Sequence, residues 1–171
     1  MTSAKRRKSE RGALNPRSLA RMAAVQALYQ MDLAGTDVAD VIDEFVEHRF
    51  GPAGFDTEAE KAGTLEGTDA AYFADILKGV VRRQRDIDPL VDHQLRTGWR
   101  LVRVDAILRA ILRAGVYELM ERSDVPARVA INEYINVAHA FFGGDEPKVV
   151  NGVLDRLAHR LRAGESEAEE G

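Results

Sequence analysis

The stretch VDAILRAILRAGVYELME, residues 104–121, decides the fold that we predict for this chain. Its large apolar residues recur at intervals of three and four, which at 100° per residue gathers them on one broad face of an α-helix. No other helical segment of the sequence is as apolar, so we expect this helix at the centre of the molecule. The apolar positions are Val104, Ile107, Leu108, Ile111, Leu112 and Leu119.

Helical periodicity extends along most of the remaining chain, and no segment alternates as a β-strand does. The pair Asn15-Pro16 is typical of a helix start, because asparagine caps free N–H groups and proline is tolerated at the first helical position. Gly35 ends that helix. Thr36 and Thr68 are predicted to cap the next two helices, over residues 37–49 and 69–85, with a polar loop from 51 to 67 between them.

Further breaks divide the second half of the chain. A short fourth helix is expected to start at Asp88-Pro89 and to close at Gly98. The central helix follows, and then Val125-Pro126 and Gly143-Gly144-Asp145 separate the last two helices, the second of which runs to Leu161. Seven helices with short connections predict an all-α bundle.

The N-terminal region is basic although the whole chain of 171 residues carries a formal charge of −4. A local excess of cations on an acidic protein favours binding of a polyanion at that place. We predict a disordered basic arm over residues 1–14, a helical domain over 15–162 and an acidic disordered tail over 163–171. The first 21 residues hold one acid, Glu10, and seven cations: Lys5, Arg6, Arg7, Lys8, Arg11, Arg17 and Arg21.

The first helix is predicted to separate its arginines from its core. Arg17 and Arg21 are four residues apart, so they stack one turn above the other. An arginine on an ordered helix loses less conformational entropy on binding than one in a tail, which favours binding of a polyanion over a mere solubility role for the basic arm. The predicted core stripe lies on another face and consists of Met22, Val25, Tyr29 and Leu33.

Two further places have alternative interpretations. The segment DEPKVVN at 145–151 starts the last helix, where free N–H groups and Lys148 are suited to a phosphate, but Asp145 and Glu146 are equally suited to capping the helix. Sequence alone favours capping. Glu118 and Arg122, four apart, are typical of an ion pair on a solvated helix face.

The composition excludes several classes of protein. Without cysteine there is no disulfide, no thiolate chemistry and no usual ligand for structural zinc. The four histidines lack metal-ligand spacing, and neither a phosphate-binding glycine loop nor a nucleophile motif is present. We therefore expect no enzyme, no metal and no cofactor. The absence of a secretory signal and of an 18-residue apolar run predicts a cytoplasmic protein with no membrane partner.

An ordered set of short motifs resembles the NusB family of transcription antitermination proteins. The first is ARMAAVQALYQMDL at 20–33, and the resemblance covers roughly residues 15–34 and 68–162. No single motif is specific, but their order is. The others are Ile111-Leu112-Arg113, Tyr117-Glu118-Leu119, Ser123-Asp124-Val125-Pro126, Ala130-Ile131-Asn132-Glu133 and Val150-Asn151-Gly152-Val153-Leu154-Asp155.

The resemblance implies two perpendicular helical subdomains, with the first helix near their junction. It also implies binding of single-stranded boxA RNA from ribosomal RNA operons, together with the ribosomal protein NusE, in the RNA polymerase elongation complex. Glu118 is then a candidate for the protein-partner surface. Val149 stands where relatives often carry an aromatic residue, so base stacking there is expected to be lost. The implied RNA-binding residues are Arg6, Arg7, Arg17, Arg21 and Lys148.

Two other functions remain as alternatives. One is a helical protein–protein adaptor whose basic arm is incidental. The other is the NusB-like part of an RNA methyltransferase system, which requires a following cofactor-binding domain, whereas the sequence ends at Gly171. The oligomeric state is left open, a homodimer included.

Overall fold

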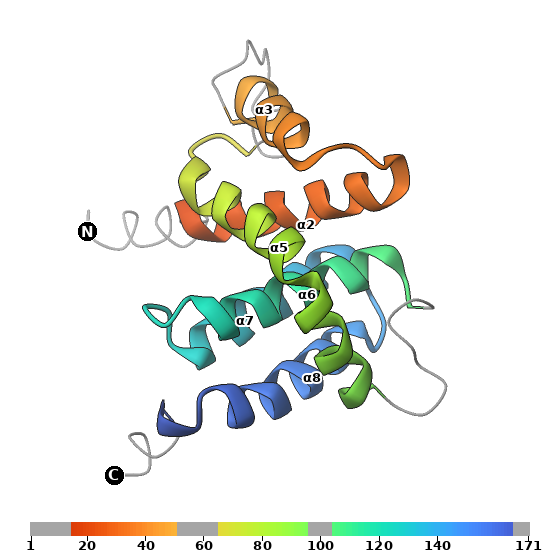
Figure 1. Cartoon of the computed structure of the whole chain (residues 1–171), viewed down its shortest axis with the longest axis vertical. Helices are drawn as coiled ribbons and strands as arrows, with labels where there is room; N and C mark the ends of the chain where they lie inside the picture. The colour runs from red at the N-terminus through yellow and green to blue at the C-terminus, as the bar shows by residue number, and fades with distance from the viewer. Residues whose placement is uncertain (1–14, 51–64, 96–103, 166–171) are drawn as a thin grey trace, which may run out of the picture.

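The computed structural model describes residues 15–50, 65–95 and 104–165, and these form an all-α fold (Figure 1). No strand occurs within these ranges. The predicted basic arm, most of the predicted loop at 51–67 and most of the predicted acidic tail lie outside the described residues. The helices are α2 (Pro16–Ala34), α3 (Val38–His48), α5 (Ala70–Gln94), α6 (Ala106–Glu121), α7 (Ala127–Phe141) and α8 (Glu146–Leu161).

The start and the end of α2 agree with the sequence prediction. The Asn15 side chain accepts a hydrogen bond from the backbone N–H of Ser18 at 2.8 Å. Gly35 adopts a left-handed conformation (φ 64°) and donates its N–H to the Met31 carbonyl, which closes the helix. The predicted caps of the next two helices were each wrong by one residue, because Asp37 and Asp69 hold those positions.

The predicted break at Pro89 is wrong, since α5 runs without interruption through it to Gln94. Proline removes one intrahelical hydrogen bond and usually kinks a helix. Ile87 and Val91 on either side are both fully buried, so packing of this segment outweighs the local preference for a break. The short helix expected from Asp88 is therefore the C-terminal part of α5.

The helices form two groups of three that meet at α6 (Figure 1). Helices α2, α3 and α5 pack on one another, as do α6, α7 and α8, and α6 also packs against both α2 and α5. The central position predicted for this helix is confirmed, with Leu108, Ile111 and Leu112 buried.

Two glycines permit the close approach of helices to α6. A Cβ atom added to Gly79 of α5 would overlap the ring of Tyr117, and one added to Gly115 of α6 would lie 2.8 Å from Leu154 of α8. The absence of a side chain at Gly79 thus permits the close contact between the two groups of helices, and its absence at Gly115 permits close packing within the second group.

The buried face of α2 differs from the predicted one. Leu33 is 68% exposed, and Met22 and Tyr29 are only partly buried. The helix packs instead through small residues, which offer little hydrophobic signal in a sequence but let helices approach closely. The residues of this small-residue face are Ala20, Ala23, Ala24 and Ala27, all fully buried.

Candidate nucleic-acid interface

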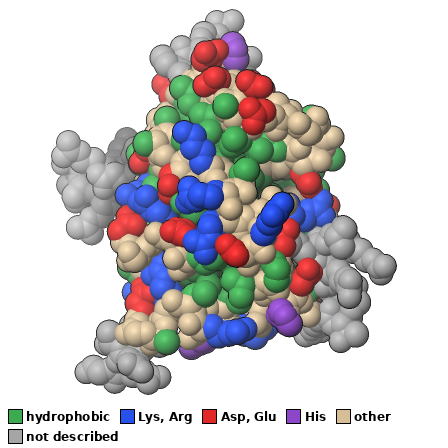
Figure 2. All heavy atoms as spheres, viewed as in Figure 1, with side chains coloured by type: hydrophobic (Ala, Val, Ile, Leu, Met, Phe, Trp, Pro, Cys, Tyr) green, Lys and Arg blue, Asp and Glu red, His purple; other side chains and the backbone are tan. Residues whose placement is uncertain are grey.

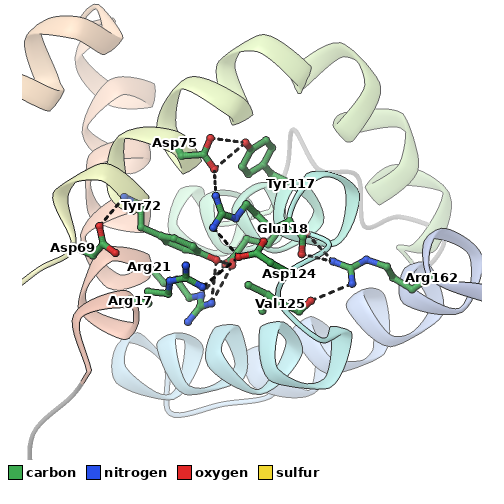
Figure 3. Close-up of polar contacts among 11 residues, drawn as sticks. Arg17, Arg21, Asp69, Tyr72, Asp75, Tyr117, Glu118, Asp124, Val125 and Arg162 are labelled. Atoms are coloured by element: carbon green, nitrogen blue, oxygen red, sulfur yellow. Dashed lines mark hydrogen bonds and ion pairs between the residues drawn. The ribbon is translucent and has the colours of Figure 1, made fainter. Parts of the chain in front are cut away.

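Arg17 lies where the sequence predicts, on the exposed first turn of α2 (Figure 3). Its side chain is 45% exposed, and its guanidinium carbon lies 4.6 Å from the centre of the Tyr72 ring. Its Nη1 is 3.5 Å from Oδ2 of Asp124. Stacking on an aromatic ring restricts the guanidinium without neutralising it, so Arg17 is an ordered and accessible cation.

Arg21, one turn further along α2, is 2% exposed, so its predicted location on the surface is wrong. Its Nε and Nη2 donate to the two carboxylate oxygens of Glu118 at 2.8 and 3.0 Å, and Nη2 also donates to the Tyr72 hydroxyl at 3.2 Å. At helical spacing Arg21 shares a face with Val25 and with the packed alanines. Arg21 therefore joins α2 to α6 inside the fold.

Glu118 is fully buried, so it does not lie on the solvated face predicted for it. It pairs with Arg21 rather than with Arg122, and it also accepts a hydrogen bond from the Tyr72 hydroxyl. A partner protein has no access to this carboxylate. Burial and the adjacent Glu118 raise the pKa of Tyr72 and that of Tyr134, so both phenols stay protonated in the core.

The charged cluster extends to the surface through residues that the sequence did not single out. Arg122, directly after α6, has its guanidinium carbon 4.6 Å from the Tyr72 ring centre, as Arg17 has. Its Nη2 donates to Asp124 at 3.0 Å, and its Nη1 is 3.5 Å from Asp75. The sequence paired Arg122 with Glu118, so its position beside Arg17 could not be foreseen from helical spacing alone.

Arg162 holds the end of α6 in place (Figure 3). Its guanidinium donates to the carbonyl oxygens of Glu118, Leu119, Arg122 and Val125 at 2.7–3.1 Å. The last carbonyls of a helix lack intrahelical partners, so this side chain of the segment after α8 caps α6. The residue is distant in sequence from the carbonyls that it binds, which explains why no local pattern indicated it.

Glu165 corrects the predicted start of the disordered tail at residue 163. Its carboxylate accepts hydrogen bonds from the backbone N–H of Ala127, at the start of α7, and from Arg162. Burial opposes ionisation, but these hydrogen bonds outweigh it and lower the pKa of Glu165. The folded part of the chain therefore extends at least to residue 165.

Lys148 lies apart from this cluster. It is 87% exposed in the first turn of α8 and lines a cavity of about 370 Å³ with Gln94 and Leu95, at the C-terminal end of α5. Tyr72 lies near the other end of that helix, and the 22 residue steps from Tyr72 to Gln94, at 1.5 Å each, place the two regions roughly 30 Å apart. Asp145 holds the N-cap position of α8, as the capping interpretation predicts, but its side chain makes no capping hydrogen bond. Arg6 and Arg7 lie outside the described residues.

Charge is distributed unevenly over the face shown in Figure 2. Acidic side chains gather at the top, over α3, whose sequence includes Asp40, Asp43, Glu44 and Glu47. Lysine and arginine side chains lie lower, over the middle of the molecule. The described residues contain no group of three or more potential metal-ligating side chains, and none of their helices is long and apolar enough to cross a membrane.

Comparison with known proteins identifies the relatives of this fold. The model of the NusB family matches residues 18–159. A transcription antitermination protein NusB of Nitrobacter hamburgensis is 53% identical over 151 residues, which cover 88% of this chain and 91% of that protein. This relative is named for antitermination, and its name mentions no catalytic activity.

Solved structures agree with the sequence comparison. A structure of T. maritima NusB matches with a TM-score of 0.67 and 28% identity, covering 85% of this chain and 92% of the other. A structure of antitermination factors NusB and NusE in complex with dsRNA matches with a TM-score of 0.66 over 84% and 96% of the two chains. At 24% identity, that second likeness concerns the fold alone.

Proposed function

Because this chain belongs to the NusB family, we propose that it is a transcription antitermination factor that binds boxA-type single-stranded RNA of ribosomal RNA operons. In this proposal it acts together with the ribosomal protein NusE and joins the RNA polymerase elongation complex. The structure whose title names NusB, NusE and dsRNA supports the choice of these two kinds of partner. The site of action is then the bacterial cytoplasm, where transcription takes place.

The observation that carries the RNA-binding part is the position of Arg17. Its guanidinium is exposed and ordered by Tyr72, on the first turn of a helix that follows the basic N-terminal sequence. Arg17 is six positions after Arg11, so chain length alone keeps their Cα atoms within about 22 Å. Ordered and tethered cations together are suited to the backbone of a single strand, whose phosphates orient it without reporting sequence.

The RNA-contacting residues in this proposal are Arg6, Arg7, Arg17 and Lys148. Arg17 and Lys148 lie near opposite ends of α5, so a strand that contacts both must run along the molecule over roughly 30 Å. Such a path extends beyond one phosphate and favours an extended single strand. Catalysis has no part in it, since holding RNA and a protein side by side requires binding alone.

The test is a titration of boxA-like and scrambled single-stranded RNA, each with and without NusE. We expect modest selectivity from the chain alone, because phosphate contacts carry no sequence information, and higher selectivity when NusE is present. Linkage then requires boxA-like RNA to tighten the contact with NusE by the same factor. Independent binding of RNA and NusE would refute the cooperative mechanism.

Removal of residues 1–14 separates this function from that of a protein adaptor with an incidental basic arm. The truncated chain should bind RNA more weakly and with a smaller salt dependence, since fewer phosphates are neutralised. RNA affinity that is unchanged by the truncation would favour the adaptor.

A further inference from the structure

Arg17 and Arg122 share one carboxylate at the surface between α2 and the end of α6. Oδ2 of Asp124 is 3.5 Å from Nη1 of Arg17 and 3.0 Å from Nη2 of Arg122. The Asp124 side chain is 51% exposed, so it reaches the two arginines from the solvent side of the cluster. A single acceptor oxygen thus stands between two guanidinium groups that come from distant parts of the chain.

The buried part of the cluster fixes both guanidinium groups in advance. Each lies 4.6 Å from the centre of the Tyr72 ring, and that ring is itself held by its hydroxyl on Glu118 and Arg21. The side chain of Arg17 is 45% exposed and that of Arg122 is 25% exposed, so part of each guanidinium is accessible from solvent. The two arginines are therefore held in place and still reach the surface.

The position of Asp124 is also set by the backbone. Arg162 donates to the carbonyl oxygens of Arg122 at 2.8 Å and Val125 at 3.1 Å, on either side of Asp124 in the chain. The contact of Asp124 with the arginines is thus built on a braced turn rather than on a free loop. Burial is outweighed by the neighbouring Arg122, which lowers the pKa of Asp124 and keeps it ionised.

We propose that Arg17 and Arg122 together form a binding site for an RNA phosphate, and that Asp124 occupies this site in the free protein. The inference rests on the proposed function. It adds Arg122 to the RNA-contacting residues and identifies Asp124 as a group that competes with the RNA phosphate. Carboxylate and phosphate oxygens both accept guanidinium N–H groups, so the carboxylate of Asp124 takes the place of the phosphate until RNA displaces it.

The competitor has a consequence for selectivity. Asp75 also pairs with Arg122, so the two arginines are balanced by two carboxylates before RNA binds. A passing polyanion then meets little net positive charge, and it must displace Asp124 to use the site. Weakly held RNA is disfavoured, whereas RNA that is also held by NusE and the basic arm supplies the phosphate at high effective concentration.

The test compares Asp124→Asn with Asp43→Asn, a matched loss of one negative charge from the exposed face of α3. Affinity for boxA-like single-stranded RNA is measured by fluorescence anisotropy at several salt concentrations. We expect Asp124→Asn to bind about threefold to tenfold more tightly at low salt, from the release of two exposed ion pairs. Asp43→Asn should change affinity less, since it acts only through the long-range field.

A double-mutant cycle assigns the effect to Arg122. Arg122→Gln should weaken binding, and in that background Asp124→Asn should lose at least half of its gain. An equal gain from Asp124→Asn and Asp43→Asn, or a loss of affinity in Asp124→Asn, would overturn the inference and leave the proposed function standing. A wild-type chain that binds no RNA, with or without NusE, would overturn both.

Discussion

Replacement of Arg21 by alanine should destabilise the fold rather than merely weaken RNA binding. The Arg21 side chain is 3% exposed, and that of its partner Glu118 is fully buried. Removal of one partner of such a pair leaves an unpaired buried charge and costs about 3–5 kcal/mol of the free energy of unfolding. For a chain of this size each kcal/mol lowers Tm by roughly 2–4 °C, so we expect a decrease of roughly 6–20 °C.

The assay is urea unfolding followed by circular dichroism, with Arg17→Ala as the matched control. The control removes an arginine from the same helix one turn earlier, where the side chain is 45% exposed, and should change stability by less than about 1 kcal/mol. The double variant Arg21→Met/Glu118→Leu replaces the pair with apolar side chains. It should be more stable than either single variant, since no buried charge is left alone.

A contrary result is easy to recognise. If Arg21→Ala unfolds within about 1 kcal/mol of the wild-type chain and loses RNA affinity, Arg21 lies at the surface, as the sequence alone predicted. If the double variant is the least stable of the three, the hydrogen bonds of the pair outweigh the burial of apolar groups. In that case the expectation that apolar side chains can replace a buried ion pair without loss of stability does not apply to this protein.

Three other variants test other parts of the structure. Gly79→Ala should lower the free energy of unfolding by about 1–3 kcal/mol, because its Cβ overlaps the buried Tyr117 ring; calorimetry should show no such decrease for Gly143→Ala, whose Cβ meets no atom within 4 Å. Glu165→Gln should lower Tm at pH 7. The folded-state pKa of Glu165 lies below its ordinary 4.5, so the ionised carboxylate stabilises the fold above pH 4.5, and this stabilisation disappears as pH falls through the folded-state pKa. A Tm difference between the variant and the wild-type chain that persists at pH 2 would contradict this. Arg17→Ala should weaken RNA binding about tenfold with Tm unchanged and reduce the slope of log affinity against log salt by about 0.7, and an unchanged slope would exclude a phosphate contact.

The sequence predicted the helices better than their faces. The boundaries of α2 follow from Asn15, Pro16 and Gly35, whose roles are local, and the central place of α6 follows from its large apolar residues. The predicted break at Pro89 is wrong because tertiary packing around Ile87 and Val91 keeps the helix continuous. Caps and helix ends depend on neighbouring residues and can be predicted from the sequence. The cost of a proline inside a helix can be offset by tertiary contacts, which the sequence does not show.

The candidate site was predictable only in part, for a related reason. Arg17 is exposed as expected. Arg21 was wrongly predicted to lie on the surface, because the prediction located the buried face of α2 from its large apolar residues, whereas that face consists mainly of alanines. Once the alanine face is recognised, Arg21 falls on it. Arg162 binds carbonyl oxygens more than 35 positions away in the sequence, and Arg122 contacts the distant Tyr72 ring and, across a turn, Asp124. These contacts depend on the tertiary fold, so no local pattern predicts them.

The two arginines on successive turns of α2 have different surroundings. Arg21 neutralises Glu118 and bonds to the hydroxyl of Tyr72, so it fixes the aromatic ring from inside. Arg17 and Arg122 lie at the same distance from the centre of that ring, and their side chains are 45% and 25% exposed. We therefore expect a change in the buried pair to alter the orientation of Tyr72 and, through it, the positions of Arg17 and Arg122. Tyr72→Phe keeps the ring but loses the hydroxyl that holds it. We therefore expect the Arg17 side chain to become more mobile in this variant, although the substitution removes a single oxygen atom.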